Sequence, residues 1–122
     1  MENWTLTWTK LTKLSSENIN KIKDNSFGVY RLSYEAEDGN YYVFYVGQAE
    51  DIKKRLQEHI STEEQNICIK NYISSKNCYF RFAIVTKSYI RDAAEKQMFK
   101  HYEPSCNERE PEGSDEIRIN LN

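Results

Sequence analysis

Hydrophobic residues alternate with polar residues in several short stretches of the chain, a period of two that is typical of strands with one buried face. The first such stretch places Trp4, Leu6 and Trp8 between threonines. Two later stretches are rich in aromatic and β-branched residues, and an Asp-Gly pair lies between them, so they predict a β-hairpin. The predicted strands cover residues 4–9, 27–34, 41–47 and 78–85, with a further candidate at 117–121.

Between the strands, apolar residues recur every three or four positions, which predicts helices. The clearest case is a stripe of Ile52, Leu56 and Ile60. Ser88 is the expected cap of the last helix, which Pro104 ends. The predicted helices cover residues 15–23, 49–60, 63–75 and 88–102. This order of elements predicts an α/β domain of the α+β kind: a small three-stranded, mostly antiparallel sheet flanked by helices, with an added N-terminal strand and helix.

The composition fits one folded domain. The chain has 122 residues, of which 39% are hydrophobic and 30% charged, and it contains no internal repeat or low-complexity segment. No apolar run approaches the roughly 20 residues that span a bilayer, and the start of the chain lacks the features of a signal peptide. We therefore expect a single domain over residues 1–122, a cytoplasmic location and no membrane partner.

Charge is distributed unevenly. The formal net charge is −2, and residues 103–116 contain six acids against one base. The best candidate for a local positive patch is Lys53-Lys54-Arg55. The acidic stretch is expected to act as a solubilising tail or, as a second hypothesis, to occupy a positive cleft.

Three cysteines, Cys68, Cys78 and Cys106, are present, and no two of them have a CxxC spacing. An odd number without that spacing favours free, buried thiols over a disulfide framework or a zinc site.

Candidate chemistry gathers around the predicted hairpin. Gly28-Val29-Tyr30 and Tyr45-Val46-Gly47 lie on either side of its turn, and glycine allows a backbone or a ligand to approach closely. Arg55 and His59 follow on the next helix, four residues apart and therefore on one face. Taken singly, each is most simply explained by packing or by solvation.

Two further residues extend this set. Glu95 lies in the last helix beside apolar neighbours, where a partly desolvated carboxylate favours a cation, either Arg91 or a metal ion. Asn107 follows that helix in a loop.

In this order, the residues resemble the GIY-YIG nuclease superfamily. Gly28-Val29-Tyr30 and Tyr45-Val46-Gly47 resemble the two signature triplets, Arg55 the helix arginine, Glu95 the metal-binding glutamate and Asn107 the asparagine that closes the core. The resemblance covers about residues 26–108, which leaves 1–25 as an N-terminal extension and 109–122 as an acidic tail. Fourteen residues separate the triplets, a few more than in the compact family pattern, and the added length falls at the hairpin turn, where insertions are tolerated.

The resemblance implies a metal-dependent endonuclease that hydrolyses phosphodiester bonds in DNA with one divalent cation, Mg²⁺ or Mn²⁺. By the same resemblance, Glu95 would hold the metal, Arg55 would stabilise transition-state charge, Tyr30 would be the general base and Tyr45 would position the water or phosphate. The residues expected at the substrate are Gly47, Gln48, Lys54, His59 and Asn107.

Two alternatives stay open. The mild charge, and the lack of the separate DNA-binding domain usual in this family, favour a non-catalytic nucleic-acid-binding or protein-interaction module on the same fold; an RNA nuclease is the other alternative. The expected partner is DNA, with branched or single-stranded forms included, together with a homodimer or a separate DNA-binding protein. Trp4 and Trp8 are expected in the core, or alternatively at such a dimer face.

Overall fold

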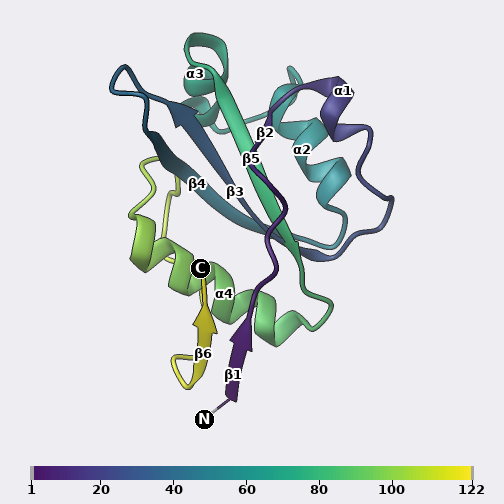
Figure 1. Ribbon diagram of the computed structural model, residues 1–122, viewed down its shortest axis with the longest axis vertical. Coiled ribbons are helices and arrows are strands. Elements are labelled where there is room, and N and C mark those ends of the chain that lie inside the picture. The colour runs from purple at the N-terminus through teal and green to yellow at the C-terminus, as the bar shows by residue number, and fades with distance from the viewer. Residues whose placement is uncertain (1, 122) are drawn as a thin grey trace.

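A computed structural model describes residues 2–121, and it confirms an α+β fold built on one antiparallel sheet (Figure 1). The sheet has four strands in the order β2-β5-β3-β4, and a separate two-stranded parallel ribbon joins β1 to β6. The strands are β1 Glu2–Thr5, β2 Thr12–Lys13, β3 Gly28–Glu35, β4 Tyr41–Ala49, β5 Cys78–Ile84 and β6 Ile117–Asn120. The helices are α1 Ser16–Ile19, α2 Ile52–Ile60, α3 Ile67–Ser75 and α4 Ser88–Tyr102.

The predicted hairpin forms the centre of the sheet. β3 pairs with β4 on one side and with β5 on the other, and Gly39, with φ of 83°, provides the left-handed residue of the turn. The prediction of three strands was wrong by one, because the short strand β2 adds to the free edge of β5. A two-residue strand is too short for a period of two to mark it.

The N-terminal strand also differs from its prediction. Its alternation continues to Thr9, but only Glu2–Thr5 forms a strand, and that strand pairs with β6 outside the main sheet. Trp8 instead makes an isolated bridge to Ala83. Both Trp4 and Trp8 pack, partly buried, against the hydrophobic core, as the sequence favoured over a dimer face.

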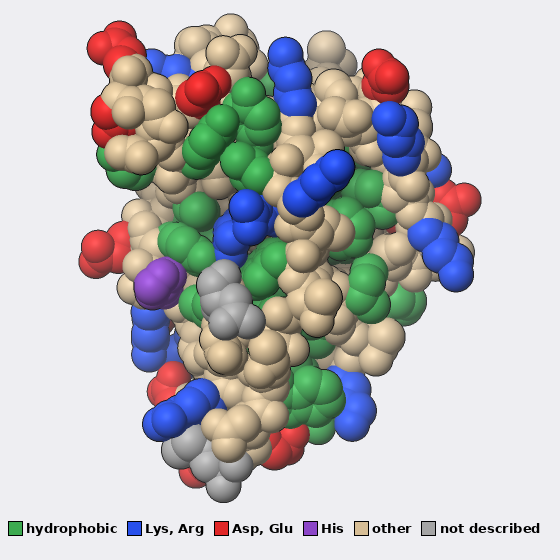
Figure 2. Space-filling view, in the orientation of Figure 1, with side chains coloured by type: hydrophobic (Ala, Val, Ile, Leu, Met, Phe, Trp, Pro, Cys, Tyr) green, Lys and Arg blue, Asp and Glu red, His purple; other side chains and the backbone are tan. Residues whose placement is uncertain are grey.

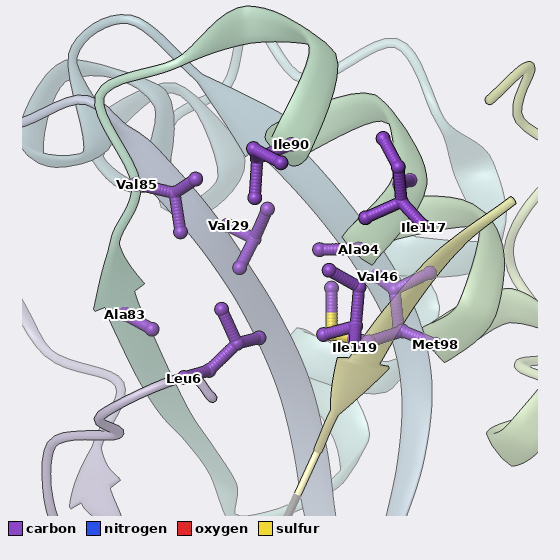
Figure 3. Packing of buried hydrophobic residues seen from close by; sticks show 11 residues of the cluster. Leu6, Val29, Val46, Ala83, Val85, Ile90, Ala94, Met98, Ile117 and Ile119 are labelled. Atoms are coloured by element: carbon purple, nitrogen blue, oxygen red, sulfur yellow. The ribbon is translucent and has the colours of Figure 1, made fainter. Parts of the chain in front are cut away.

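The sheet separates two hydrophobic clusters. On one side Tyr30 and Leu32 of β3 pack with Ile52 and Leu56 of α2 and with Ile69 of α3. On the other side Val29 and Val46 point toward α4, where they meet Ile90, Ala94 and Met98, and the β1–β6 ribbon adds Ile117 and Ile119 (Figure 3). The residue order of one strand therefore decides which side chains reach α2 and which reach α4.

Helix starts differ from prediction in three places, the first being α2, which begins at Ile52 and not at residue 49 because Asp51 caps it. Ser88 is the first residue of α4 and not its cap; Lys87 holds the N-cap position and makes no side-chain cap hydrogen bond. The third helix begins at Ile67, since Asn66 caps it by accepting a hydrogen bond from the Ile69 amide. None of the helices in residues 2–121 has the length and apolar character needed to cross a membrane.

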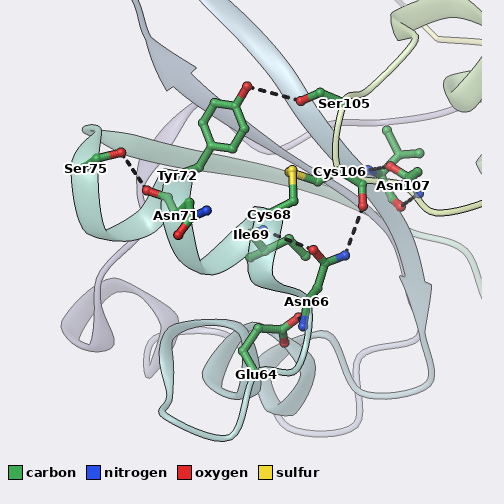
Figure 4. The surroundings of a disulfide bond; sticks show 11 residues. Glu64, Asn66, Cys68, Ile69, Asn71, Tyr72, Ser75, Ser105, Cys106 and Asn107 are labelled. Atoms are coloured by element: carbon green, nitrogen blue, oxygen red, sulfur yellow. Dashed lines mark hydrogen bonds between the residues drawn. A yellow bond between two sulfur atoms is a disulfide. The ribbon is translucent and has the colours of Figure 1, made fainter.

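The prediction of three free thiols was wrong for two of them. Cys68 of α3 and Cys106, which follows α4, form a disulfide between positions 38 residues apart (Figure 4). The loop around Cys106 lies against the sheet, because the Cys106 amide donates to the Phe44 carbonyl at 2.8 Å and Asn66 donates to the Cys106 carbonyl at 2.9 Å. Only the tertiary fold brings these segments together, so sequence spacing gave no sign of the bond. Cys78 is free and buried, as predicted.

The acidic segment is part of the fold. Asp115 forms ion pairs with Lys96 and Lys100 of α4, and Lys96 also donates to the Gly113 carbonyl. The chain then enters β6. The segment therefore packs along α4 instead of extending as a tail.

Candidate active site

The two glycine triplets lie side by side, because Tyr30 of β3 is paired with Gly47 of β4. A Cβ atom on Gly47 would lie 2.6 Å from both the Cζ and the hydroxyl oxygen of Tyr30. A Cβ atom on Gly28 would lie 2.2 Å from the carbonyl oxygen of Ala83 in β5. Each triplet thus needs its glycine for a steric reason: one lets β5 approach, and the other makes room for a tyrosine ring.

Tyr30 begins a buried polar chain. Its side chain is 1% exposed, and its hydroxyl lies 2.7 Å from Nε2 of His59. On the other side of the imidazole, Nδ1 lies 3.2 Å from a Glu64 carboxylate oxygen, although the angle is outside hydrogen-bond range. Burial and the charge of Arg55 lower the pKa of His59 to about 3, so the imidazole is neutral at pH 7. With Nδ1 protonated, Nε2 accepts from the Tyr30 hydroxyl.

Burial keeps Tyr30 in its phenol form. It raises the pKa of Tyr30 well above the ordinary 10.0; Tyr45 adds to this rise, and Arg55 opposes it. The hydroxyl is therefore protonated at neutral pH, and it donates its hydrogen bond to the neutral imidazole of His59.

A cleft of about 1270 Å³ opens beside this chain, between α2, α4 and the loops at 62–66 and 107–111. Tyr45, Arg55, Glu95 and Asn107 all line it, whereas Tyr30 and His59 do not. Its other lining residues are Glu58, Thr62, Glu63, Glu64, Gln65, Asn66, Lys70, Glu108, Arg109 and Pro111. Five carboxylates and three cations thus face the cleft, so its wall is on balance negative.

Within the cleft, Tyr45 and Arg55 are electrostatic neighbours. Burial raises the pKa of Tyr45, and the Arg55 guanidinium partly opposes that rise by favouring the phenolate. The ring of Tyr45 stacks edge-on against His59, with centroids 5.3 Å apart. Arg55 itself lies 3.5 Å from Glu64 and keeps about a third of its side chain exposed. The arrangement leaves a guanidinium available to a ligand beside a phenol.

Glu95 faces this pair from α4. Burial raises the pKa of its carboxyl, a hydrogen bond from Gln48 at 3.2 Å opposes the rise, and the nearby Asp92 adds to it. Gln48 also donates to Asp92 at 2.7 Å. The cation partner considered for Glu95, Arg91, donates instead to the Val85 and Thr86 carbonyls and to Gln48. No basic side chain among residues 2–121 lies within ion-pair distance of Glu95, which leaves a metal ion as the remaining candidate.

Glu95 fits a divalent cation as a single protein ligand. Its oxygens are the donors that Mg²⁺ and Mn²⁺ prefer, and its uncompensated, half-buried charge would be relieved by a cation. Residues 2–121 hold no cluster of three or more His, Cys, Asp or Glu side chains that could enclose a metal. Such an ion would therefore keep water and substrate oxygens as its other ligands, as Mg²⁺ often does in proteins.

Asn107 fastens the loop after α4 to the sheet. Its amide accepts from the Val46 backbone N–H at 3.0 Å and donates to the Val46 carbonyl at 2.9 Å. Of the two roles expected for Asn107, locking the loop or touching the substrate, these contacts account for the first.

Two other residues expected at the substrate lie elsewhere. The His59 side chain is fully buried behind Tyr45, so it has no surface with which to contact a phosphate. Lys54 is exposed on α2 and does not line the cleft. Sequence reasoning missed Glu64 and Asp92, which join the His59 and Gln48 networks; nothing in the local pattern distinguishes either acid from a solvated one.

The chain is similar to known proteins in both sequence and fold. The family model described as the GIY-YIG catalytic domain matches residues 26–110. Proteins named UvrABC system protein C from Rickettsia felis and Rickettsia akari are 30% identical to the chain over 80 residues. The match covers 66% of this chain but only 12% and 11% of those relatives, so the chain corresponds to a small part of each.

Solved structures of the GIY-YIG N-terminal endonuclease domain of UvrC from Thermotoga maritima have the same fold. Two point mutants of that domain, each bound to its catalytic divalent cation, superpose with a TM-score of 0.56 at 19% and 18% identity. The superposition covers 76% of this chain and 98% of that domain.

Proposed function

The chain belongs to the GIY-YIG family, and on that basis we propose that it is an endonuclease that hydrolyses phosphodiester bonds in DNA with one divalent cation. The observation that carries the proposal is the convergence of Tyr45, Arg55 and Glu95 on one cleft. UvrC from Thermotoga maritima, whose endonuclease domain has this fold, binds a catalytic divalent cation. Metal-dependent phosphodiester hydrolysis would use all three groups: the Arg55 guanidinium, the Tyr45 phenol and the Glu95 carboxylate. Of these, Glu95 is the one that lacks a cation partner among residues 2–121.

Glu95 is the proposed metal ligand, and Mg²⁺ or Mn²⁺ are the proposed ions. When bound, the ion supplies positive charge that neutralises the scissile phosphate and assists the leaving oxygen. The cleft wall carries more carboxylates than cations, so a phosphate in the cleft needs the added positive charge of the ion.

Arg55 is proposed to stabilise the charge that develops on the phosphate oxygens. Its guanidinium reaches the cleft and keeps about a third of its surface exposed. A planar, permanently charged donor fork suits two phosphate oxygens at once. Glu64, at 3.5 Å in the same cleft, holds the guanidinium in place.

Tyr45 is proposed as the general base, which reverses the assignment expected from the sequence. Its ring lines the cleft beside Arg55, where its oxygen can meet an attacking water, whereas the Tyr30 hydroxyl is buried and bonded to His59. Arg55 favours the Tyr45 phenolate that must form before the water proton is taken up. Tyr30, His59 and Glu64 are proposed to hold the Tyr45 ring in place from behind.

Metal-dependent cleavage tests the proposal. We expect the protein to nick supercoiled plasmid with Mg²⁺ or Mn²⁺, and we expect EDTA to stop it. Glu95→Gln should abolish cleavage while leaving the far-ultraviolet circular dichroism unchanged, and Glu63→Gln, an exposed carboxylate of the same cleft, should retain it. If Glu95→Gln cuts as fast as the parent, the metal assignment is wrong.

The substrate panel separates the alternatives. Linear, branched and single-stranded DNA should be compared with RNA of the same sequence. Faster cleavage of RNA would favour the RNA nuclease, and binding without cleavage under either metal would favour the non-catalytic module.

The two tyrosines can be separated by paired variants. General-base catalysis contributes on the order of 10²- to 10⁴-fold, so Tyr45→Phe should lower kcat by that amount. Tyr30→Phe removes a positioning contact and should lower kcat much less. Because the phenolate is the scarce form, kcat of the parent should rise with pH between 6 and 9. A larger loss in Tyr30→Phe than in Tyr45→Phe would restore the original assignment.

A further inference from the structure

The face of the sheet that carries α4 holds a second group of cations and aromatic rings, on the opposite face from Tyr45. Residues directly opposite each other in an antiparallel pair project to one face. Lys13 is opposite Tyr79, and Arg31 is opposite Arg81, so these four share the α4 side of the sheet. Tyr41 joins them, because its ring meets that of Tyr79 edge-on at 5.1 Å. We call Lys13, Arg31, Tyr41, Tyr79 and Arg81 the basic sheet face.

The arginine pair is the most unusual feature of this face. Like charges directly opposite each other destabilise a sheet. Of the carboxylates in residues 2–121, none lies within ion-pair distance of Arg31 or Arg81. Arg31 is held instead by rings: its guanidinium lies 4.5 Å from the centroid of Trp8 and donates to the Tyr102 hydroxyl at 2.6 Å. Two cations held together without an acid favour binding of an anion from outside.

The aromatic residues lie next to this charge. Tyr41 is 44% exposed, and Tyr79 is half-buried two residues along β5 from Arg81, which is about 7 Å. One acid, Glu35, shares this face: it lies four residues along β3 from Arg31, about 13 Å, and after burial its charge and hydrogen bond are causes that raise the pKa of the Tyr79 hydroxyl. The arginine end of the face is therefore positive, and the rings lie toward its other end, where Tyr41 is directly opposite Glu35.

No helix covers this part of the sheet. Helix α4 crosses only the lower part of the face in Figure 1, and α1, α2 and α3 lie on the other side. In Figure 2, which shows the same side, basic side chains and hydrophobic side chains interleave over the sheet above α4, and most of the acidic side chains lie toward the margins.

From this arrangement we propose that the basic sheet face binds a segment of single-stranded nucleic acid. Arg81 and Lys13 would contact phosphates, with the charge of Arg31 beneath them, and the rings of Tyr41 and Tyr79 would stack on bases. A face of four strands is too broad to enter a groove of duplex DNA, whereas unpaired bases can stack on exposed aromatic rings. The proposal goes beyond the cleavage reaction and does not depend on it.

The negative charge of the cleft wall indicates what the basic sheet face would contribute to binding. A wall with five carboxylates and three cations attracts a polyanion weakly, so a positive surface elsewhere on the chain would add to its affinity for nucleic acid. The basic sheet face is a surface of this chain with the matching charge.

The test is fluorescence anisotropy with labelled oligo(dT) and oligo(rU), in EDTA so that no divalent cation contributes. Arg81→Gln should weaken binding on the order of 10-fold and reduce the slope of log K against log salt by about 0.7, the value for one phosphate contact on a single strand. Tyr79→Ala should weaken it by about 5- to 150-fold, the range expected for one stacked base. Tyr79→Phe should bind as the parent does, because the ring is kept.

The controls separate this surface from the cleft. Lys21→Gln removes an exposed cation near α1 and should change neither affinity nor slope. Glu95→Gln should retain oligonucleotide binding even where cleavage is lost, so the two proposals fail independently. Equal binding by the parent and both face variants, combined with loss of binding in Arg55→Ala, would overturn the inference by assigning binding to the cleft. Binding of polyglutamate in preference to oligo(dT) would also overturn it, by making the face a docking site for acidic proteins.

Discussion

Replacing Gly47 with alanine should disable the enzyme through Tyr30, a residue on the neighbouring strand. The new Cβ would lie 2.6 Å from the Tyr30 ring and hydroxyl, whereas non-bonded carbon atoms rest about 3.5 to 4.0 Å apart. Something must therefore move by about 1 Å. The Tyr30 side chain is 1% exposed and bonded to His59, so it cannot swing into solvent to make room.

The size of the effect follows from that displacement. Overpacking a buried site typically destabilises a protein by about 1 to 3 kcal/mol. A misplacement of about 1 Å near an active site can lower the rate about 100-fold. We expect both, because the moving ring supports His59 and, through it, the ring of Tyr45.

Two measurements and two further variants isolate the cause. Urea unfolding gives the stability of Gly47→Ala, and plasmid nicking with Mg²⁺ gives its rate. Ile119→Val, in the core beside α4, should lose about 1 kcal/mol without loss of activity, which controls for destabilisation alone. In a Tyr30→Phe background the ring Cζ would still lie 2.6 Å from the new Cβ, so Gly47→Ala should lower the rate by about the same factor as in the parent. A Gly47→Ala enzyme that cuts at the parent rate would refute the steric argument.

Three further outcomes are expected. Burial lowers the pKa of His59 to about 3 in the folded protein, and unfolding restores its ordinary value of 6.5. The free energy of unfolding should therefore fall as pH drops below 6.5, by up to about 1.4 kcal/mol per pH unit. His59→Gln should lack this slope in urea titrations between pH 7 and 5. Cys68→Ala, or a reductant, should lower stability by up to about 4 kcal/mol, the loop entropy for 38 residues, and an unchanged urea midpoint would argue against the disulfide. Asn107→Ala leaves two backbone groups of the buried Val46 without partners and should lose about 1 to 3 kcal/mol, whereas a stability within 0.5 kcal/mol of the parent would mean that water replaces the amide.

The sequence predicted the hairpin, the order of the elements and the residues of the cleft because those features are local or carry a family pattern. The alternation of residues around Gly28 and Gly47 predicts two strands, whatever those strands pack against. Three features were not predictable, since they depend on contacts distant in sequence: the strand β2, the Cys68–Cys106 bond and the parallel pairing of β1 with β6. A two-residue edge strand and a pair of cysteines 38 positions apart leave no periodic trace.

The same limit applies to the two tyrosines. Both have the same neighbours in sequence, a valine and a glycine, and nothing local distinguishes them. Both project to the same face of the sheet, since Leu32, two residues from Tyr30, is directly opposite Tyr45, so their difference arises from the strand on which each lies. Tyr30 lies on a central strand beneath α2, whereas Tyr45 lies on the edge strand where the cleft opens. Which phenol can meet a water is therefore a property of strand order.

Strand order also explains how one small sheet can offer two different surfaces. The central strand β3 directs Tyr30 toward α2 and its next residue, Arg31, toward α4. A slip of one residue in register would exchange the two, placing a guanidinium in the apolar cluster and a phenol on the basic sheet face. The glycine of the first triplet opposes such a slip, since any larger residue at position 28 would collide with the β5 backbone. Gly28→Ala should therefore reduce both plasmid nicking and oligo(dT) binding, in contrast to Gly47→Ala, which should spare the binding. If Gly28→Ala lost cleavage but kept oligo(dT) binding, the basic sheet face would not depend on the register of β3.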